Sequence, residues 1–148
     1  GKDGSDAVKF MFNANKGGEM QELSKVDSGG ELSRLMLAVK SLISQKNLLP
    51  TVVFDEIDIG VSGQIADKVG TILSKLSVSM QVIAITHLPQ IAGKGNSHFF
   101  VYKETDKNST KTEIKILDPE ERVLEIAKML SGKDVTSASV ETARHLLK

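Results

Sequence analysis

Apolar residues follow two different spacings along the chain, and the change between them predicts its elements. Short apolar runs at 51–55 and 81–86 suit buried parallel strands. Apolar positions that recur every three or four residues predict amphipathic helices over 30–44 and 65–76. Strand, helix and strand at this spacing form a βαβ unit, whose crossover is expected to be right-handed.

The remaining pattern predicts smaller elements around this unit. Residues 8–13 suit a strand, 19–27 a loop and 88–92 a short helix, while 97–103 and 112–117 suit the strands of a hairpin joined by 104–111. Asp118, Pro119 and Glu121 form a strong helix start, and a last helix is expected over 137–147. The predicted fold class is therefore α/β, a mainly parallel sheet flanked by helices, with a late β-hairpin and two C-terminal helices.

Composition narrows the class of protein. The 148 residues are 40% hydrophobic and 26% charged, with 19 basic and 19 acidic residues, so no basic excess marks a surface that follows nucleic acid. The absence of cysteine excludes disulfides and thiol chemistry and fits a reducing cytosol. No membrane span or signal peptide is evident, and residues 1–7 are expected to be disordered or foreign to the native sequence. We expect a soluble, cytosolic domain.

Two adjacent carboxylates, Asp55 and Glu56, follow the strand at 51–54. A carboxylate at a strand end can hold Mg²⁺, which keeps several of its waters, and its neighbour can polarise a water that attacks phosphorus. The alternative is that the pair is merely solvated, because strand ends are often acidic. Two carboxylates at the edge of a core are costly unless they are paired or used, which favours a functional interpretation.

Ser28, Gly29, Gly30 and Glu31 stand at the start of the helix over 30–44. Ser-x-x-Glu is a capping box, which explains the pattern without any ligand. Two glycines in the first turn weaken a helix, however, and suit a place where a ligand approaches the backbone. Exposed amides at a helix start then meet an anion, so a phosphate site is predicted, and both interpretations can hold together.

His87 follows the strand at 81–86, whose end is expected beside the end of the strand at 51–55. There it could bond a phosphate or orient a water, although a lone histidine at a strand end is often structural. His98 and His145 are expected to be structural, and no pair of histidines has the spacing of a zinc site. The phosphate loop Gly-x-x-x-x-Gly-Lys-Ser/Thr is absent, so the chain is not expected to build a whole nucleotide site alone.

These motifs, taken in order, resemble those of ABC-type ATPase heads, and more narrowly those of RecN, the bacterial SMC-like family of DNA double-strand break repair. The resemblance runs through nearly the whole chain and is carried by residues 25–34, 54–63, 85–90 and 125–132. One departure is Asp27, where the broader ABC pattern has leucine; a carboxylate beside a triphosphate should weaken binding unless it points away.

The resemblance implies a role for each motif residue. Residues 28–31 become the signature motif that faces ATP on the opposite head, with Ser28, Gly29, Gly30 and Glu31 as its binding residues. Asp55 would serve Mg²⁺, Glu56 would be the general base, and His87 would sense the γ-phosphate. Asp58, at the start of the D-loop, would contact the opposing site.

The resemblance also implies the setting of these residues. Residues 1–148 would be the C-terminal half of a P-loop NTPase head of the ABC/SMC type, inactive alone. ATP and Mg²⁺ would be the cofactors of the complete head dimer. The partners would be the N-terminal half of the same head with its Walker A loop, a second head, and DNA, with no membrane. The full-length protein would be a cytoplasmic, nucleoid-associated ATPase that clamps or tethers DNA ends.

Two alternatives stay open at this point. The chain could belong to another ABC-type ATPase, including a transporter motor, although residues 57–63 and 86–90 suit the repair family better. It could also be a non-catalytic module for head dimerisation. Glu56 speaks against that alternative, because a scaffold has no need of a general base.

Overall fold

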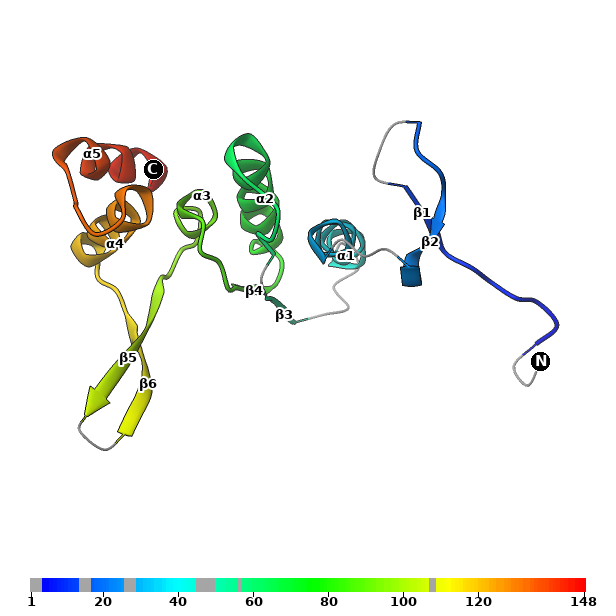
Figure 1. Cartoon of the computed structure of the whole chain (residues 1–148), viewed down its shortest axis with the longest axis horizontal. Coiled ribbons are helices and arrows are strands. Elements are labelled where there is room, and N and C mark those ends of the chain that lie inside the picture. The colour runs from blue at the N-terminus through cyan, green and yellow to red at the C-terminus, as the bar shows by residue number, and fades with distance from the viewer. Residues whose placement is uncertain (1–3, 14–16, 26–28, 45–49, 56, 107–108) are drawn as a thin grey trace.

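The computed structural model describes residues 4–13, 17–25, 29–44, 50–55, 57–106 and 109–148. Its helices follow one another along the long axis of the molecule, and the strands lie as three separate pairs (Figure 1). None of the described helices is both long and apolar enough to span a membrane.

The predicted βαβ unit is present and forms the main core. β3 (Thr51–Phe54) and β4 (Gln81–Ala84) pair in parallel, with Val52 opposite Val82 and Phe54 opposite Ala84. α2 (Gly63–Leu76) lies between them in the sequence and packs on one face of the pair (Figure 1). Alternate residues of β3 point into this core, because successive side chains of a strand face opposite ways. The buried apolar cluster comprises Leu37, Val52, Phe54, Ile57, Val61, Ala66, Val69, Leu73, Leu76, Met80 and Ile91.

α1 (Gly29–Ser44) forms where the helical spacing predicted it, but its apolar face is only partly covered. Leu37, which is not on the predicted face, is buried in the main core. Much of the predicted face stays open, with exposed fractions of 41% at Met36, 39% at Val39 and 65% at Leu42. The prediction that this face packs on a sheet is therefore only partly confirmed.

The N-terminal region differs from its prediction. β1 (Met11–Phe12) and β2 (Gln21–Glu22) form a short antiparallel pair, and a 3₁₀ turn, η1 (Leu23–Lys25), follows. The prediction of a loop over 19–27 is therefore wrong for these residues. β2 is polar and only two residues long, so it shows no alternation of apolar and polar residues that would reveal a strand.

The late hairpin is confirmed and is longer than predicted. β5 (Phe99–Asp106) pairs antiparallel with β6 (Ser109–Ile116) and projects away from the helices (Figure 1). Most of the polar stretch 104–111 is therefore strand, because cross-strand pairing extends the ladder beyond its apolar part. One face of the hairpin carries opposed apolar pairs, Phe99 with Ile116 and Val101 with Ile114, and these four side chains are exposed.

The two C-terminal helices, α4 (Pro119–Ser131) and α5 (Ser137–Leu146), pack together through small and apolar residues. Ile126, Ala127 and Ala143 are fully buried between them. The predicted capping box at Asp118 is confirmed, since its carboxylate accepts hydrogen bonds from the amides of Glu120 and Glu121 at 2.9 and 2.8 Å.

Arg122 joins this helix pair to the main core. Its guanidinium donates to carbonyls at and after the end of the short helix α3 (Pro89–Ala92), including those of Ala92, Gly93 and Gly95. Backbones also meet closely here, because a Cβ on Gly93 would lie 2.9 Å from the carbonyl oxygen of Leu146. α3 therefore connects the βαβ unit to α4 and α5, directly after the segment that carries His87.

Candidate functional site

The carboxyl ends of β3 and β4 bring the candidate residues to one edge. Beyond the last paired residues, the amide of Ile85 donates to the carbonyl of Phe54 at 2.8 Å, so the chains leave the sheet side by side. Asp55 follows one strand directly, and Thr86 and His87 follow the other. In open α/β sheets, ligands bind outside the carboxyl ends of parallel strands, which makes this edge the candidate site.

Asp58 is the buried polar residue of this edge, with 2% of its surface exposed. One carboxylate oxygen, Oδ2, accepts a short hydrogen bond from the hydroxyl of Thr86 and a bond of 2.8 Å from the amide of His87. The Nδ1 atom of the His87 ring lies 3.0 Å from the same oxygen. The loop after β3 is thereby fastened to the segment after β4.

The environment of Asp58 lowers the pKa of its carboxyl group. Burial acts in the opposite direction, since it disfavours the charged form, but hydrogen bonds from the Thr86 hydroxyl and the His87 amide outweigh it and stabilise the carboxylate. Asp58 is therefore a buried anion at neutral pH, and an anion can only accept hydrogen bonds.

His87 contrasts with Asp58, because 74% of its side chain is exposed. One ring nitrogen faces the buried carboxylate, while most of the ring is open to an external group. His98 has a different setting: burial, followed by the charge of Arg122, lowers its pKa, against an opposing effect of Glu125. Of the two, His87 has the access that a ligand-binding role requires.

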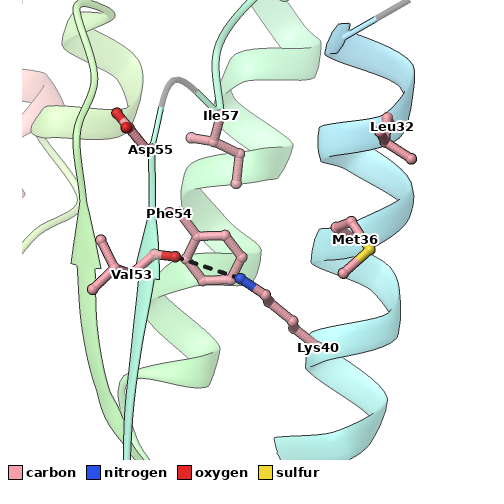
Figure 2. Close-up of a pocket in the computed structure, with 7 residues that line it drawn as sticks. All are labelled: Leu32, Met36, Lys40, Val53, Phe54, Asp55 and Ile57. Atoms are coloured by element: carbon pink, nitrogen blue, oxygen red, sulfur yellow. Dashed lines mark hydrogen bonds between the residues drawn. The ribbon is translucent and has the colours of Figure 1, made fainter.

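Asp55 lies at the margin of an open groove of about 200 Å³ between α1 and β3 (Figure 2). Lys40 reaches across this groove, donating to the carbonyl of Val53 at 3.4 Å and lying 4.8 Å from the ring centroid of Phe54. No group of three or more His, Cys, Asp or Glu side chains gathers among the described residues. Asp55 is exposed at this edge, and its role as a Mg²⁺ ligand stays a prediction.

The structure explains why position 30 is a glycine, which the sequence alone does not. A Cβ at this position would lie 2.2 Å from the carbonyl oxygen of Ile59, a distance no side chain can occupy. The backbone that approaches Gly30 is therefore the chain's own loop after β3, whereas the sequence suggested a ligand. The contact holds the start of α1 against the loop that carries Asp58, and Gly29 and Glu31 lie in the same first turn.

Some of the residues that the sequence singles out are not described by the structure. Ser28, Glu56 and the divergent Asp27 lie outside the described residues. The ligand-binding roles of Gly29, Gly30, Glu31 and Asp58 stay predictions. No role at this edge was predicted for Thr86, although its position between a strand and His87 is the available signal. Its Oγ1 also accepts a hydrogen bond from the amide of Leu88 at 3.1 Å.

Comparison with known proteins gives close relatives over nearly the whole chain. The DNA repair protein RecN of Rickettsia conorii is 47% identical over 145 residues, which are 98% of this chain and 27% of the relative. RecN of Vibrio cholerae is 44% identical over 97% of this chain and 26% of the relative, and RecN of Bacillus subtilis 43% over 99% and 26%. The chain thus spans about a quarter of the length of these relatives, in their C-terminal part. No family model matches it.

A solved structure from work on ATP-driven dimerization and DNA-stimulated activation of SMC ATPases is also similar. It aligns with a TM-score of 0.54 over 80% of this chain and 70% of that chain, at 20% sequence identity. This likeness concerns the fold alone and confirms the predicted α/β class, with a parallel strand pair, a late hairpin and two C-terminal helices.

Proposed function

Because the chain belongs to the RecN family, we propose that it is the C-terminal segment of an ATPase head in a longer DNA repair protein, called the full-length protein below. Residues 1–148 would form the C-terminal half of that head. The observation that carries the proposal is the edge formed by Asp55, Asp58 and His87, since it lies where α/β proteins place their ligands.

The described residues fit a magnesium nucleotide in part. Asp55 is exposed beside the groove and can hold Mg²⁺, which would neutralise charge on the phosphates. α1 begins at Gly29, directly after Ser28 in the sequence, and the start of a helix is where an anion can be bound. Glu56 is proposed to accept the proton of the attacking water, and His87 to orient that water beside the terminal phosphate.

Uncovered apolar faces support a partner within the same head. Val53, Ile83 and Ile85 are exposed on the side of the β3–β4 pair that α2 does not cover, and the apolar face of the hairpin is exposed as well. Clustered apolar surface of this kind marks an interaction site. We assign it to the N-terminal half of the head, which would supply the Walker A loop that this sequence lacks.

The remaining parts of the proposal concern the assembly. The signature residues 28–31 would face ATP bound to a second head, so that ATP binding joins two heads and hydrolysis releases them. This cycle would couple ATP to the clamping or tethering of DNA ends by a cytoplasmic, nucleoid-associated protein. The neutral charge of the chain supports a DNA-binding surface of which much would lie elsewhere in the full-length protein.

The same exposed apolar faces also favour a second candidate, a dimerisation module that keeps the scaffold without hydrolysis. Substitution of Glu56 separates the two. In the full-length protein, Glu56→Gln should lower ATP hydrolysis by about 10²–10⁴-fold while ATP binding is retained, because the general base alone is removed. Glu113→Gln, in the exposed strand β6, is the matched control. Hydrolysis that is unaltered by Glu56→Gln would contradict the catalytic assignment.

A further inference from the structure

All the described hydrogen bonds of the Asp58 carboxylate to other residues go to two consecutive residues after β4. The Thr86 hydroxyl, the His87 amide and the His87 ring nitrogen Nδ1 all converge on Oδ2. A buried carboxylate is costly without such partners, so its position and that of the 86–87 segment depend on each other. Thr86 is in turn fixed by the amide of Leu88, which donates to its hydroxyl oxygen at 3.1 Å.

The loop that carries Asp58 is also held from its other side. The carbonyl of the next residue, Ile59, lies against Gly30 so closely that no Cβ could stand between them. The carboxylate therefore has little freedom to turn toward another partner. Only 2% of the surface of Asp58 is exposed, so a contact with an opposing head would require this loop to move.

The chemistry of the pair determines which ring nitrogen of His87 is available. Nδ1 lies 3.0 Å from the Asp58 carboxylate, which can only accept hydrogen bonds, so this approach is favourable only when Nδ1 carries a hydrogen. In the neutral ring the other nitrogen, Nε2, then holds the lone pair. Because 74% of the His87 side chain is exposed and Nδ1 faces inward, Nε2 belongs to the accessible part of the ring.

We propose that Asp58 is a positioning residue for His87: it fixes the ring and keeps the hydrogen on Nδ1, so that Nε2 is presented to the ligand of this edge. An Nε2 that carries no hydrogen accepts a hydrogen bond, and an ionised phosphate has none to donate. The inference therefore rests on the proposed function in one respect, since that function supplies the donor that Nε2 faces, the water that attacks the terminal phosphate. It replaces the role at an opposing site that the family resemblance implies for Asp58.

A double-mutant cycle in the full-length protein tests this role. kcat and KM for ATP are measured for Asp58→Ala, His87→Ala and the double variant. A misplaced ring should lower kcat by about tenfold to a hundredfold in Asp58→Ala. If Asp58 acts through His87, the double variant has the kcat of His87→Ala alone. An undiminished loss from Asp58→Ala in the His87→Ala background would overturn the proposal, because a general structural role or a contact with another head would persist there.

Asp58→Asn distinguishes a loss of positioning from a loss of folding. The amide keeps one acceptor oxygen and the shape of the carboxylate, so it can take the same donors and should recover most of the kcat lost in Asp58→Ala. An Asp58→Asn variant that is folded but as slow as Asp58→Ala would contradict positioning. Ile126→Ala, in the α4–α5 cluster, serves as a destabilised control that does not touch the edge.

The hydrogen position is measured directly by ¹⁵N NMR of histidine-labelled full-length protein, with His87→Ala identifying the signal. The neutral ring of the wild type should carry its hydrogen on Nδ1, and Asp58→Ala should shift it toward Nε2. A wild-type ring with its hydrogen on Nε2 would refute the inference even if ATP is hydrolysed. Conversely, hydrolysis that is unchanged in His87→Ala would defeat the proposed role of His87, while the NMR result still decides how Asp58 acts on the ring.

Discussion

The α4–α5 pair and the carboxyl edge of the β3–β4 pair bury their residues by opposite means. Between the helices, the fully buried residues Ile126, Ala127 and Ala143 are all apolar, and the buried Ser139 is neutral. At the edge, the buried group is the Asp58 carboxylate, and its partners lie 28 and 29 positions away in the sequence. Apolar burial between the helices stabilises the chain. Burial of the Asp58 carboxylate at the edge is costly by itself, and it holds a charge beside the exposed His87.

The largest expected effect on stability comes from the helix pair. Ile126→Ala removes a fully buried side chain and should lower the free energy of unfolding by about 3 kcal/mol. The exposed Leu124→Ala on the same helix is the control and should change it far less. Urea unfolding measures both, and ATP hydrolysis per folded full-length molecule should stay unchanged. A loss of hydrolysis in the folded Ile126→Ala variant would break the distinction between the two regions.

The next effect lies where the edge meets α1. Gly30→Ala introduces a Cβ against the carbonyl of Ile59 and should destabilise the chain by about 2 kcal/mol, because the helix or the loop must move. In an open helix the same change stabilises by about 1 kcal/mol, so the sign of the effect is diagnostic. Urea unfolding gives the sign, and a rise in stability would show that the close contact does not exist.

A smaller effect is expected at the start of α4. Asp118→Ala removes the acceptor for the amides of Glu120 and Glu121 and should cost about 1 kcal/mol. Asp134→Ala, an exposed aspartate outside the helices, is the matched control. Equal urea midpoints for the two variants would show that the cap contributes nothing.

The smallest expected effect is the pH dependence of stability that arises from the buried Asp58 carboxylate. Burial raises the pKa of Asp58, but hydrogen bonds from Thr86 and the His87 amide together lower it by more than burial raises it. The folded pKa therefore lies below the unfolded value of about 3.9. The resulting stabilisation is present above that value and is lost as the pH falls through the folded pKa. Below about pH 4, the wild type should therefore lose a part of its free energy of unfolding that Asp58→Asn does not lose. Parallel pH profiles for the two proteins would contradict this.

The sequence could predict features that depend on neighbouring residues, and it could not predict features that depend on contacts between distant ones. The start of α4 was predictable because Asp118, Pro119 and Glu121 act within one helical turn. The βαβ unit was predictable because its apolar spacing is local to each element. Polar residues of β5 and β6 became strand only through pairing with each other, which no spacing reveals.

The candidate site was predictable in location but not in detail. Adjacent acidic residues and a histidine after two apolar strands indicated the sheet edge. That Asp58 would be buried against Thr86 and His87 depends on how two loops meet, and the resemblance suggested a different partner. Gly30 shows the same limit, because its neighbour Ile59 is distant in the sequence.

We propose above that this chain supplies one edge of an ATP site that is split between two parts of the head. The most direct test measures ATP hydrolysis by this chain, by the N-terminal half of the head, and by the two mixed. We expect no hydrolysis by either part alone and activity on mixing, which Glu56→Gln abolishes. Tight ATP binding by this chain alone would contradict the account, because its sequence contains no phosphate loop that could hold the nucleotide.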